Sequence, residues 1–369
     1  MEEWRKYKLK DFIEFNPKEK VPQGELCRKI SMDQITPFTR FVESNIYEVY
    51  KGGAKFRNYD TIMARITPCL ENGKTAYISS LHPEEVAVGS TEYIVLRKRE
   101  NISDSKFIFY LAISPIVRDI AIKSMVGSSG RQRVQQDVLE NYEIPIPSLP
   151  TQKNIAHILS VLDDKIELNK RINDNLEQQA QALFNEMFPH ITEGENMIGD
   201  LIMPKRGKGL LSKNAIKGDI PVVAGGIEPA TYHNQANTTA PVLTIAASGA
   251  NAGYINLWHI PVWASDSSYI DDSITPNVYF WYIMLKKRQK EIFDAQVGSA
   301  QPHIYPKHIA ELPMNVVFVE KIAEYNEIVT PIFEKKGQFF LESKRLTSLR
   351  DTLLPKLMSG ELKITDISN

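Results

Sequence analysis

Cysteine is scarce in this 369-residue chain, which contains only Cys27 and Cys69. Two cysteines outside any metal-ligand spacing predict neither a disulfide framework nor a zinc site. Long hydrophobic runs are also missing, since the longest, residues 278–285, is far shorter than the ~20 residues that a membrane-spanning helix needs. The charged start, MEEWRKYKLKDF, has no apolar core of the kind found in signal peptides. We therefore expect a cytoplasmic protein that does not contact a membrane.

An excess of positive charge is missing too. The 44 lysines and arginines are balanced by 45 acidic residues, giving a net charge of −1. This balance argues against a uniformly basic surface for nucleic acid but permits local basic patches. The length suggests two or three domains, at roughly 100–200 residues per domain.

Recognisable catalytic motifs are also absent. Residues 68–75 end like a phosphate-binding P-loop, but Pro68 occupies the place of its first glycine. Ser248 has no identifiable base partner in the sequence. The Asp163-Asp164-Lys165 cluster resembles a nuclease motif, but it lies in a helical heptad pattern, where exposed coiled-coil charges explain it better. The seven histidines show no ligand spacing, so we predict no catalytic residue and no metal site.

What the sequence does contain is a long internal duplication. Phe109 matches Phe280, and the tripeptide Val126-Gly127-Ser128 matches Val297-Gly298-Ser299, at a constant offset of 171 residues. Such a period is too long for a solenoid, whose units run roughly 20–50 residues. The duplicated unit is therefore a whole domain followed by a helix. Tyr110 and Trp281, which also match, lie on apolar helical faces and are expected in the core.

A long heptad stripe follows the first copy. From Gln152 to Phe188 the chain has no glycine or proline, and ten positions from Ile155 to Met187 recur at alternating steps of four and three residues. Eight of the ten are apolar, which predicts a helix of ~37 residues, ~55 Å long, that needs a partner helix. Thr151 is its predicted N-cap. Asn169 and Asn173 interrupt the stripe, where polar residues can fix register.

The partner helix is predicted after the second copy, at about residues 320–358. Its apolar positions are patchier, and we expect Pro331 and Gly337 to kink or loosen it. The predicted class is α+β: two similar α+β domains separated by a pair of long antiparallel coiled-coil helices. The boundaries are 1–150 and 191–318 for the domains, and 151–190 and 319–369 for the helices, the last with a C-terminal segment.

Several of these motifs, in this order, resemble the specificity subunits of type I restriction–modification systems. The resemblance rests on residues 63–74 (MARITPCLENGK), residues 245–255 (IAASGANAGYI) with Ala264-Ser265-Asp266, the GSSGRQR loop, the PIPSLPTQ linker and the terminal LLPKLMSG segment. It covers nearly the whole chain. Two departures stand out in the second copy: residues 314–318 lack the proline-rich pattern, and residues 298–303 lack the arginines of the first loop.

The resemblance implies a non-catalytic subunit that reads a bipartite site on double-stranded DNA, one half with each target-recognition domain. It implies that the helices set the gap between the halves and dock two methyltransferase subunits, to which restriction subunits are added. The implied cofactors, S-adenosylmethionine, ATP and Mg²⁺, would be bound by those partners and not by this chain.

Candidate DNA-binding residues carry the side chains that reach bases or phosphates. They are Arg131, Gln132, Arg133, Asn72 and Lys74 in the first domain, and Lys205, Arg206, Lys208, Ser248, Asn251, Gln301 and His303 in the second. Direct base contact is favoured for 131–133, and phosphate contact for 205–208. The candidate partner-docking residues are Leu159, Leu162, Ile166, Leu176, Leu183, Leu353 and Leu357.

Two other functions remain open from the sequence. One is a bipartite DNA-binding regulator that works without methyltransferase partners and binds DNA tightly by itself. The other is a hydrolase that uses Ser248 and whose remaining site residues escape detection.

Overall fold

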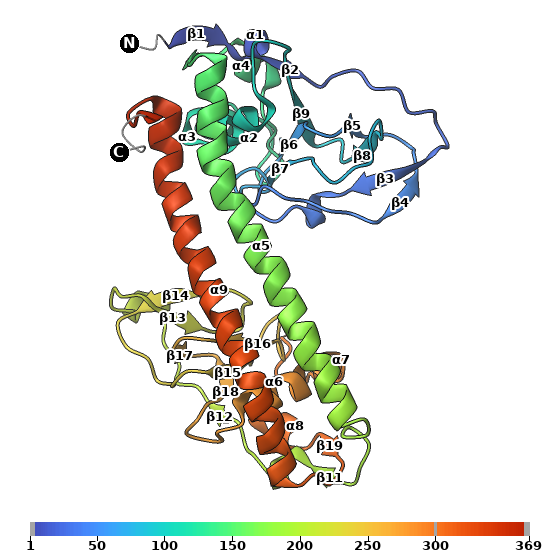
Figure 1. Cartoon of the computed structure of the whole chain (residues 1–369), viewed down its shortest axis with the longest axis vertical. Coiled ribbons are helices and arrows are strands. Elements are labelled where there is room, and N and C mark those ends of the chain that lie inside the picture. The colour runs from blue at the N-terminus through green and yellow to red at the C-terminus, as the bar shows by residue number, and fades with distance from the viewer. Residues whose placement is uncertain (1–3, 299–300, 365–369) are drawn as a thin grey trace. The chain divides into compact units, whose positions relative to one another are not determined.

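The structure is a computed structural model that describes residues 4–298 and 301–364. Its elements are labelled in Figure 1. The chain divides into two compact units, Met1–Leu168 with Glu342–Asn369 and Asn169–Leu341. Each unit takes in part of both long helices, α5 (Leu149–Met187) and α9 (Val319–Ser359). The α+β class and the two long helices expected from the sequence are confirmed.

The first unit contains two four-stranded sheets and a small two-stranded sheet. One sheet has the order β2-β9-β6-β7 and the other the order β4-β3-β8-β5, while β1 pairs with β10. The strands are β1 (Arg5–Lys8), β2 (Ile13–Phe15), β3 (Leu26–Ile30), β4 (Tyr47–Val49), β5 (Ala54–Phe56), β6 (Thr61–Ala64), β7 (Thr75–Tyr77), β8 (Ala87–Gly89), β9 (Tyr93–Lys98) and β10 (Glu143–Ile146).

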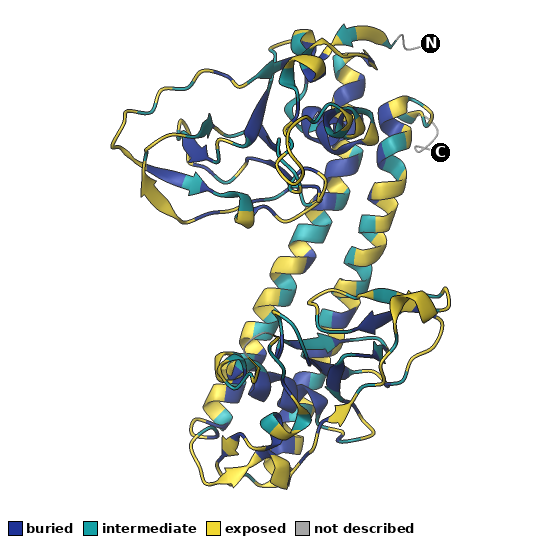
Figure 2. Cartoon of the chain, turned by 180° about the vertical axis from the view of Figure 1, so that it is seen from behind, coloured by how far each residue is buried: buried dark blue, intermediate teal, exposed yellow. Residues whose placement is uncertain are grey.

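Helix α2 (Ser105–Ile113) packs on the first unit's sheet β2-β9-β6-β7, and the other short helices pack beside it. These are α1 (Leu9–Phe12), α3 (Pro115–Lys123) and α4 (Gln136–Asn141), with a 3₁₀ turn at Met32–Gln34. The N-cap of α2 is Asp104, whose side-chain carboxylate accepts a hydrogen bond from the backbone amide of Phe107. The side chains of α2 from Phe107 to Ile113 are buried, which Figure 2 shows as a continuous dark segment. This helix therefore forms the centre of the unit's core.

The second unit repeats this arrangement, except that β5 has no counterpart. Its sheet β12-β18-β15-β16 corresponds to β2-β9-β6-β7, its sheet β14-β13-β17 to β4-β3-β8, and its pair β11-β19 to β1-β10. In both units one strand pair of the second sheet is parallel, β3 with β8 and β13 with β17. The strands are β11 (Asn196–Met197), β12 (Lys205–Arg206), β13 (Ile220–Val223), β14 (Thr231–His233), β15 (Val242–Ala246), β16 (Ile255–Trp258), β17 (Trp263–Ala264), β18 (Ser267–Ile270) and β19 (Pro313–Met314).

The helices of the second unit follow the same plan. They are α6 (Val278–Lys287), α7 (Gln289–Asp294) and α8 (Pro306–Ala310), with 3₁₀ turns at Ile198–Asp200 and Ser212–Asn214. Tyr110 on α2 and Trp281 on α6, matched in the sequence, are both buried in their unit's core. The internal duplication is thus confirmed at the level of the fold. Ser299, part of the matching tripeptide, lies outside the described residues.

The two long helices run antiparallel within each unit. In the first, Asp163 and Lys165 of α5 pair with Arg350 and Glu342 of α9, at 2.8 and 3.6 Å. In the second, Glu177 pairs with Lys336, and the Tyr325 hydroxyl donates to the Ala180 carbonyl at 2.9 Å. Residue numbers rise along one helix as they fall along the other. The ten stripe positions from Ile155 to Met187 are all buried or half-buried, as a helix pair requires.

One predicted helix end needs correction. Residues 105–123 form two helices, because Pro115 begins a new one after Ser114. Helix α5 begins at Leu149, so Thr151 lies inside its first turn and is not the N-cap. Proline is tolerated in a first turn, where the missing N–H has no helical partner, and this allows Pro150 to lie inside the helix.

Helix α9, which we expected Pro331 and Gly337 to kink or loosen, is continuous through both residues. Buried side chains on either side of Pro331, Val329 and Phe333, hold that stretch against the second unit's core. Gly337 has a packing role: a Cβ there would lie 2.8 Å from Cγ of the His259 ring. The glycine therefore lets the imidazole pack directly on the helix backbone.

His259 should make the second unit sensitive to acid. Burial lowers the pKa of this imidazole to about 4, below the ordinary value of the unfolded chain. The unfolded state then binds a proton first as pH falls, so this contribution to stability is complete above pH ~6.5 and declines by up to ~3 kcal/mol towards pH 4. The check is the pH dependence of unfolding of the second unit, compared with His259→Gln. Equal slopes for both proteins between pH 6.5 and 4 would refute it.

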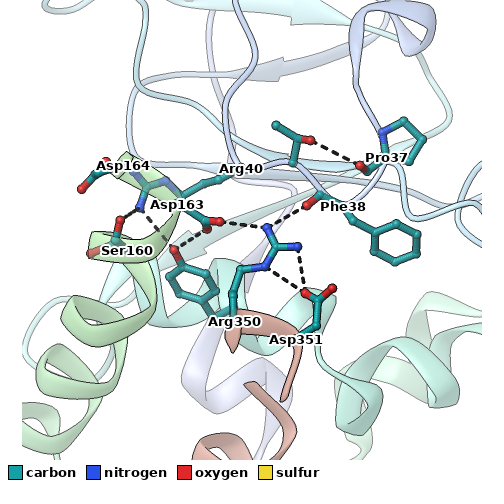
Figure 3. Close-up of polar contacts among 10 residues, drawn as sticks. Pro37, Phe38, Arg40, Ser160, Asp163, Asp164, Arg350 and Asp351 are labelled. Carbon is teal, nitrogen blue, oxygen red and sulfur yellow. Dashed lines mark hydrogen bonds and ion pairs between the residues drawn. The ribbon is translucent and has the colours of Figure 1, made fainter. Parts of the chain in front are cut away.

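A buried polar network ties the first unit's sheet domain to its helices (Figure 3). The carboxylate of Asp163 accepts from the Tyr110 hydroxyl at 2.6 Å and from Arg350 at 2.8 Å. Arg350 also donates to the Phe38 carbonyl at 3.1 Å, and Arg40 donates to the Tyr110 hydroxyl at 3.2 Å. Asp163 is only 4% exposed. The expectation of an exposed coiled-coil charge is therefore wrong for Asp163, which forms a buried ion pair with Arg350.

The second unit holds the same combination of groups. The Tyr282 hydroxyl on α6 donates to Glu177 of α5 at 2.8 Å, and Glu177 pairs with Lys336 of α9. In each unit a tyrosine from the sheet domain, a carboxylate from α5 and a cation from α9 thus form one set. Burial raises the pKa of Tyr282, so its hydroxyl stays protonated and donates to the carboxylate.

Candidate nucleic-acid interface

In the first unit, two exposed segments are joined by backbone hydrogen bonds. One is the turn at residues 66–74, which follows β6, and the other is the loop at residues 126–133, which follows α3. Thr67 donates to the Gln132 carbonyl at 3.0 Å, and Val134 donates to the Arg65 carbonyl at 2.9 Å. We call these two segments the turn–loop pair of the unit. They bring the candidate residues Asn72 and Arg131–Arg133 to one edge of the fold.

The second unit has an equivalent turn–loop pair, formed by residues 248–254 and 297–303. Gly249 donates to the Pro302 carbonyl at 3.0 Å, and Ile304 donates to the Ala247 carbonyl at 2.9 Å. These bonds correspond one for one to those of the first unit. Residues 299 and 300 of this loop lie outside the described residues. The frame is therefore retained even though the loop sequences differ.

Beside each turn–loop pair, an arginine is held by a carboxylate. Arg133 donates from Nε and one Nη to Glu92, at 2.7–3.0 Å. In the second unit Arg206 donates to Asp266 at 2.6 Å, and the Ser248 hydroxyl donates to the other oxygen of Asp266. The hydrogen bond from Arg133 lowers the pKa of Glu92, which keeps this carboxylate ionised at neutral pH.

The remaining candidates of the first domain differ in their surroundings. Arg131 and Asn72 are exposed, and Gln132 is half-buried at the join of the turn–loop pair. Lys74 is half-buried and donates from Nζ to the Met32 carbonyl at 2.6 Å. The ammonium of Lys74 thus has an internal acceptor, which ties the turn to the segment after β3.

In the second domain, the lysines lie next to the turn–loop pair. Lys205 on β12 donates to the Ser273 hydroxyl at 2.9 Å, and the exposed Lys208 follows β12. Asn251 lies in the turn. In the loop, Gln301 is exposed, and His303 is half-buried with its ring stacked on Tyr305 at 5.9 Å between centroids. The structure therefore groups Arg206, Ser248, Asn251, Gln301 and His303 around one frame.

Glu92 and Asp266 were missed as site residues by the sequence reasoning. Each immediately precedes the equivalent strand, β9 or β18, and each accepts an amide hydrogen bond at its carbonyl from the residue after the inner strand, at 2.9 and 3.1 Å. A comparison of the two copies extended to their strands pairs these two carboxylates. The signal was present in the sequence, but the matched region began only at residue 109.

The hydrolase alternative finds no support in the geometry around Ser248. Its hydroxyl donates directly to the Asp266 carboxylate. The nearby His303 ring bonds the Gln301 carbonyl at 2.8 Å through Nδ1 instead. A nucleophilic serine needs its base on the hydroxyl, with the carboxylate behind the base. Among residues 4–298 and 301–364, no cluster of three or more potential metal ligands occurs either.

The candidate partner-docking residues fall into two groups. Leu159 and Leu357 are fully buried in the first unit's own core, so the expectation that these two side chains contact a partner is wrong. Packing within the chain already uses their surface. The others are half-buried on the long helices: Leu162, Ile166, Leu176, Leu183 and Leu353. No helix of the described residues is both long and apolar enough to cross a bilayer.

Comparison with known proteins finds a family model that matches the first part of the chain, and several similar proteins. Residues 1–178 match the family described as "Type I restriction modification DNA specificity domain". A putative type I specificity subunit of Mycoplasma pneumoniae is 27% identical over 276 residues, 69% of this chain and 72% of the relative. The EcoAI specificity subunit of Escherichia coli is 32% identical over 208 residues, 53% of this chain but only 34% of the relative.

The fold agrees with these matches. The crystal structure of the type I restriction–modification S subunit from M. genitalium superposes with a TM-score of 0.57, covering 96% of each chain at 21% identity. The chain is a duplicated α+β protein with the fold of that subunit. It is similar in sequence to specificity subunits of type I restriction–modification systems.

Proposed function

We propose that the chain is the DNA-recognition subunit of a type I restriction–modification complex and reads a bipartite site, one half with each turn–loop pair. The observation that carries this is the repeated frame: two sets of equivalent backbone hydrogen bonds, each presenting a carboxylate-held arginine beside exposed polar residues. Base reading needs donors of fixed orientation on exposed segments. Two such sites in one chain can each read one short DNA sequence, and the two sequences can differ.

The proposed partners supply the chemistry. Two methyltransferase subunits would dock on the long helices, with the half-buried Leu162, Ile166, Leu176, Leu183 and Leu353 as contacts. Restriction subunits would join that complex. S-adenosylmethionine, ATP and Mg²⁺ would be bound by those partners. We infer that this chain is itself non-catalytic, since no nucleophile with a base is found among the described residues of its candidate interface.

The test is the pattern of methylated adenines in the genome with and without this gene. We expect a split sequence motif that loses methylation when the gene is deleted and regains it when the gene is restored. An unchanged pattern in a strain whose methyltransferase is expressed would refute the proposal.

A second measurement separates the non-catalytic role from the alternatives. The purified chain, incubated with DNA and labelled S-adenosylmethionine, is expected to transfer no methyl groups until the methyltransferase subunits are added. Methyl transfer by the chain alone would refute this assignment. Tight sequence-specific binding by the chain alone, unchanged by the partners, would instead favour a partner-free regulator.

A further inference from the structure

The two carboxylate-held arginines come from different places in the two copies. Arg133 lies at the end of the loop in the first turn–loop pair, and the position equivalent to it in the second is His303. The His303 ring is stacked on Tyr305 and does not pair with Asp266. Arg206, which does, comes from β12, the counterpart of β2. The two units therefore supply the arginine from different elements, whereas the carboxylate lies at the equivalent position in both.

The equivalence of the carboxylates rests on the backbone. Arg65 donates to the Glu92 carbonyl at 2.9 Å, and Ala247 donates to the Asp266 carbonyl at 3.1 Å. Both acids begin the strand that pairs with the inner strand, β9 with β6 and β18 with β15. A guanidinium thus pairs with the equivalent carboxylate in both units, although Arg133 comes from a loop and Arg206 from β12.

The geometry of the pairs leaves part of each guanidinium available. Arg133 uses Nε and one Nη toward Glu92, and its side chain remains 48% exposed. Arg206 uses one Nη toward Asp266 and is 40% exposed. A guanidinium has five donors in a rigid fork. The carboxylate fixes the plane of the fork and offsets its charge, which suits directional reading of a base better than attraction to a phosphate.

We propose that Arg133 and Arg206 each read one guanine in the major groove, with Glu92 and Asp266 as the positioning residues that aim them. Paired acceptors O6 and N7 of guanine match two donors of an arginine fork. The recognised DNA site therefore contains a required guanine in each half. This inference rests on the proposed function and assigns Arg206 to a base, whereas the sequence suggested a phosphate contact.

The test uses the whole complex, with chain and methyltransferase partners expressed together, and reads the methylated motif across the genome. Arg133→Lys and Arg206→Lys keep the charge and remove the fork. We expect each to reduce discrimination at one guanine, in one half only, by roughly 5- to 100-fold. A wild-type motif with no required guanine in one half would overturn the inference. Uniform weakening at all sequences, the behaviour of a phosphate contact, would overturn it as well.

The matched control is Lys98→Ala, which removes a cation from another exposed ion pair, with Glu100 at 3.0 Å. It is expected to leave the motif unchanged. Thermal unfolding of each variant complex checks that the fold is retained. If a lysine variant lowers the melting temperature, Arg133→Gln and Arg206→Gln repeat the measurement.

The positioning role has its own readout. Glu92→Gln and Asp266→Asn should relax the same base position as the arginine each one holds, and no other. Adding Arg133→Lys to Glu92→Gln should cause little further relaxation, because both act on one contact. Independent, multiplying effects would overturn the positioning role. If the wild-type gene directed no methylation at all, the proposed function itself would be contradicted. The failure of this inference and the failure of the proposed function are thus distinguishable.

Discussion

Replacing Asp163 with alanine is expected to lower the free energy of unfolding of the first unit by about 3–5 kcal/mol. Its carboxylate is the common acceptor of Tyr110 and Arg350, at 2.6 and 2.8 Å, in the buried network of Figure 3. Removing it leaves the buried Arg350 guanidinium without its buried counter-ion. Amide hydrogen exchange along α2 and along residues 149–168 of α5 measures the loss directly, since these segments belong to this unit alone.

Asp351→Ala provides the matched control. Asp351 also pairs with Arg350, at 2.8 Å, but its side chain is 58% exposed. Because water screens an exposed pair, we expect a loss of no more than ~1 kcal/mol. Equal losses for the two variants would contradict the view that burial gives the Asp163 pair its importance.

Phe184→Ala should produce a loss of similar size in the second unit, about 3–5 kcal/mol. Phe184 on α5 is fully buried, and its ring lies 5.2–5.5 Å from those of Phe188, Phe280 and Tyr325. Truncation removes this apolar surface and leaves a cavity that three rigid rings cannot fill. Hydrogen exchange of α6 amides measures the result.

Phe340→Ala on α9 is the corresponding control, since the same substitution is made at an exposed position of the same unit. We expect its effect to stay within ~0.5 kcal/mol. A small loss for Phe184→Ala would mean that α5 does not contribute to the second unit's core.

Periodic features of the fold could be predicted from the sequence. The heptad positions of α5 and the duplicated domain follow from repeating apolar patterns, and both are confirmed. Such patterns report burial averaged over many residues, so single departures do not erase them. Helix α9 accordingly continues through Pro331 and Gly337. Packing of the neighbouring side chains outweighs the local preference of two residues.

Pairings between distant residues could not be predicted in the same way. Asp163 has two partners, Tyr110 and Arg350, and the more distant one lies 187 positions away along the chain. A charged residue in a helix has the same local sequence signal whether it faces water or a buried arginine. The ion pairs of Glu92 and Asp266 are of the same kind, because each arginine comes from another part of the chain, although a strand-by-strand comparison of the two copies does align the carboxylates themselves.

The tyrosine–carboxylate–cation sets also limit which domains can be grafted into this chain. In the second unit Glu177 and Lys336 belong to the long helices, whereas Tyr282 belongs to the sheet domain. A chimaera that exchanges residues 196–318 keeps the ion pair and imports whatever side chain replaces the tyrosine. A donor domain with a hydroxyl at that position meets a ready acceptor, and one with phenylalanine leaves a carboxylate lone pair without its partner. Compatibility between a foreign domain and these helices can thus be screened at one position before any gene is built.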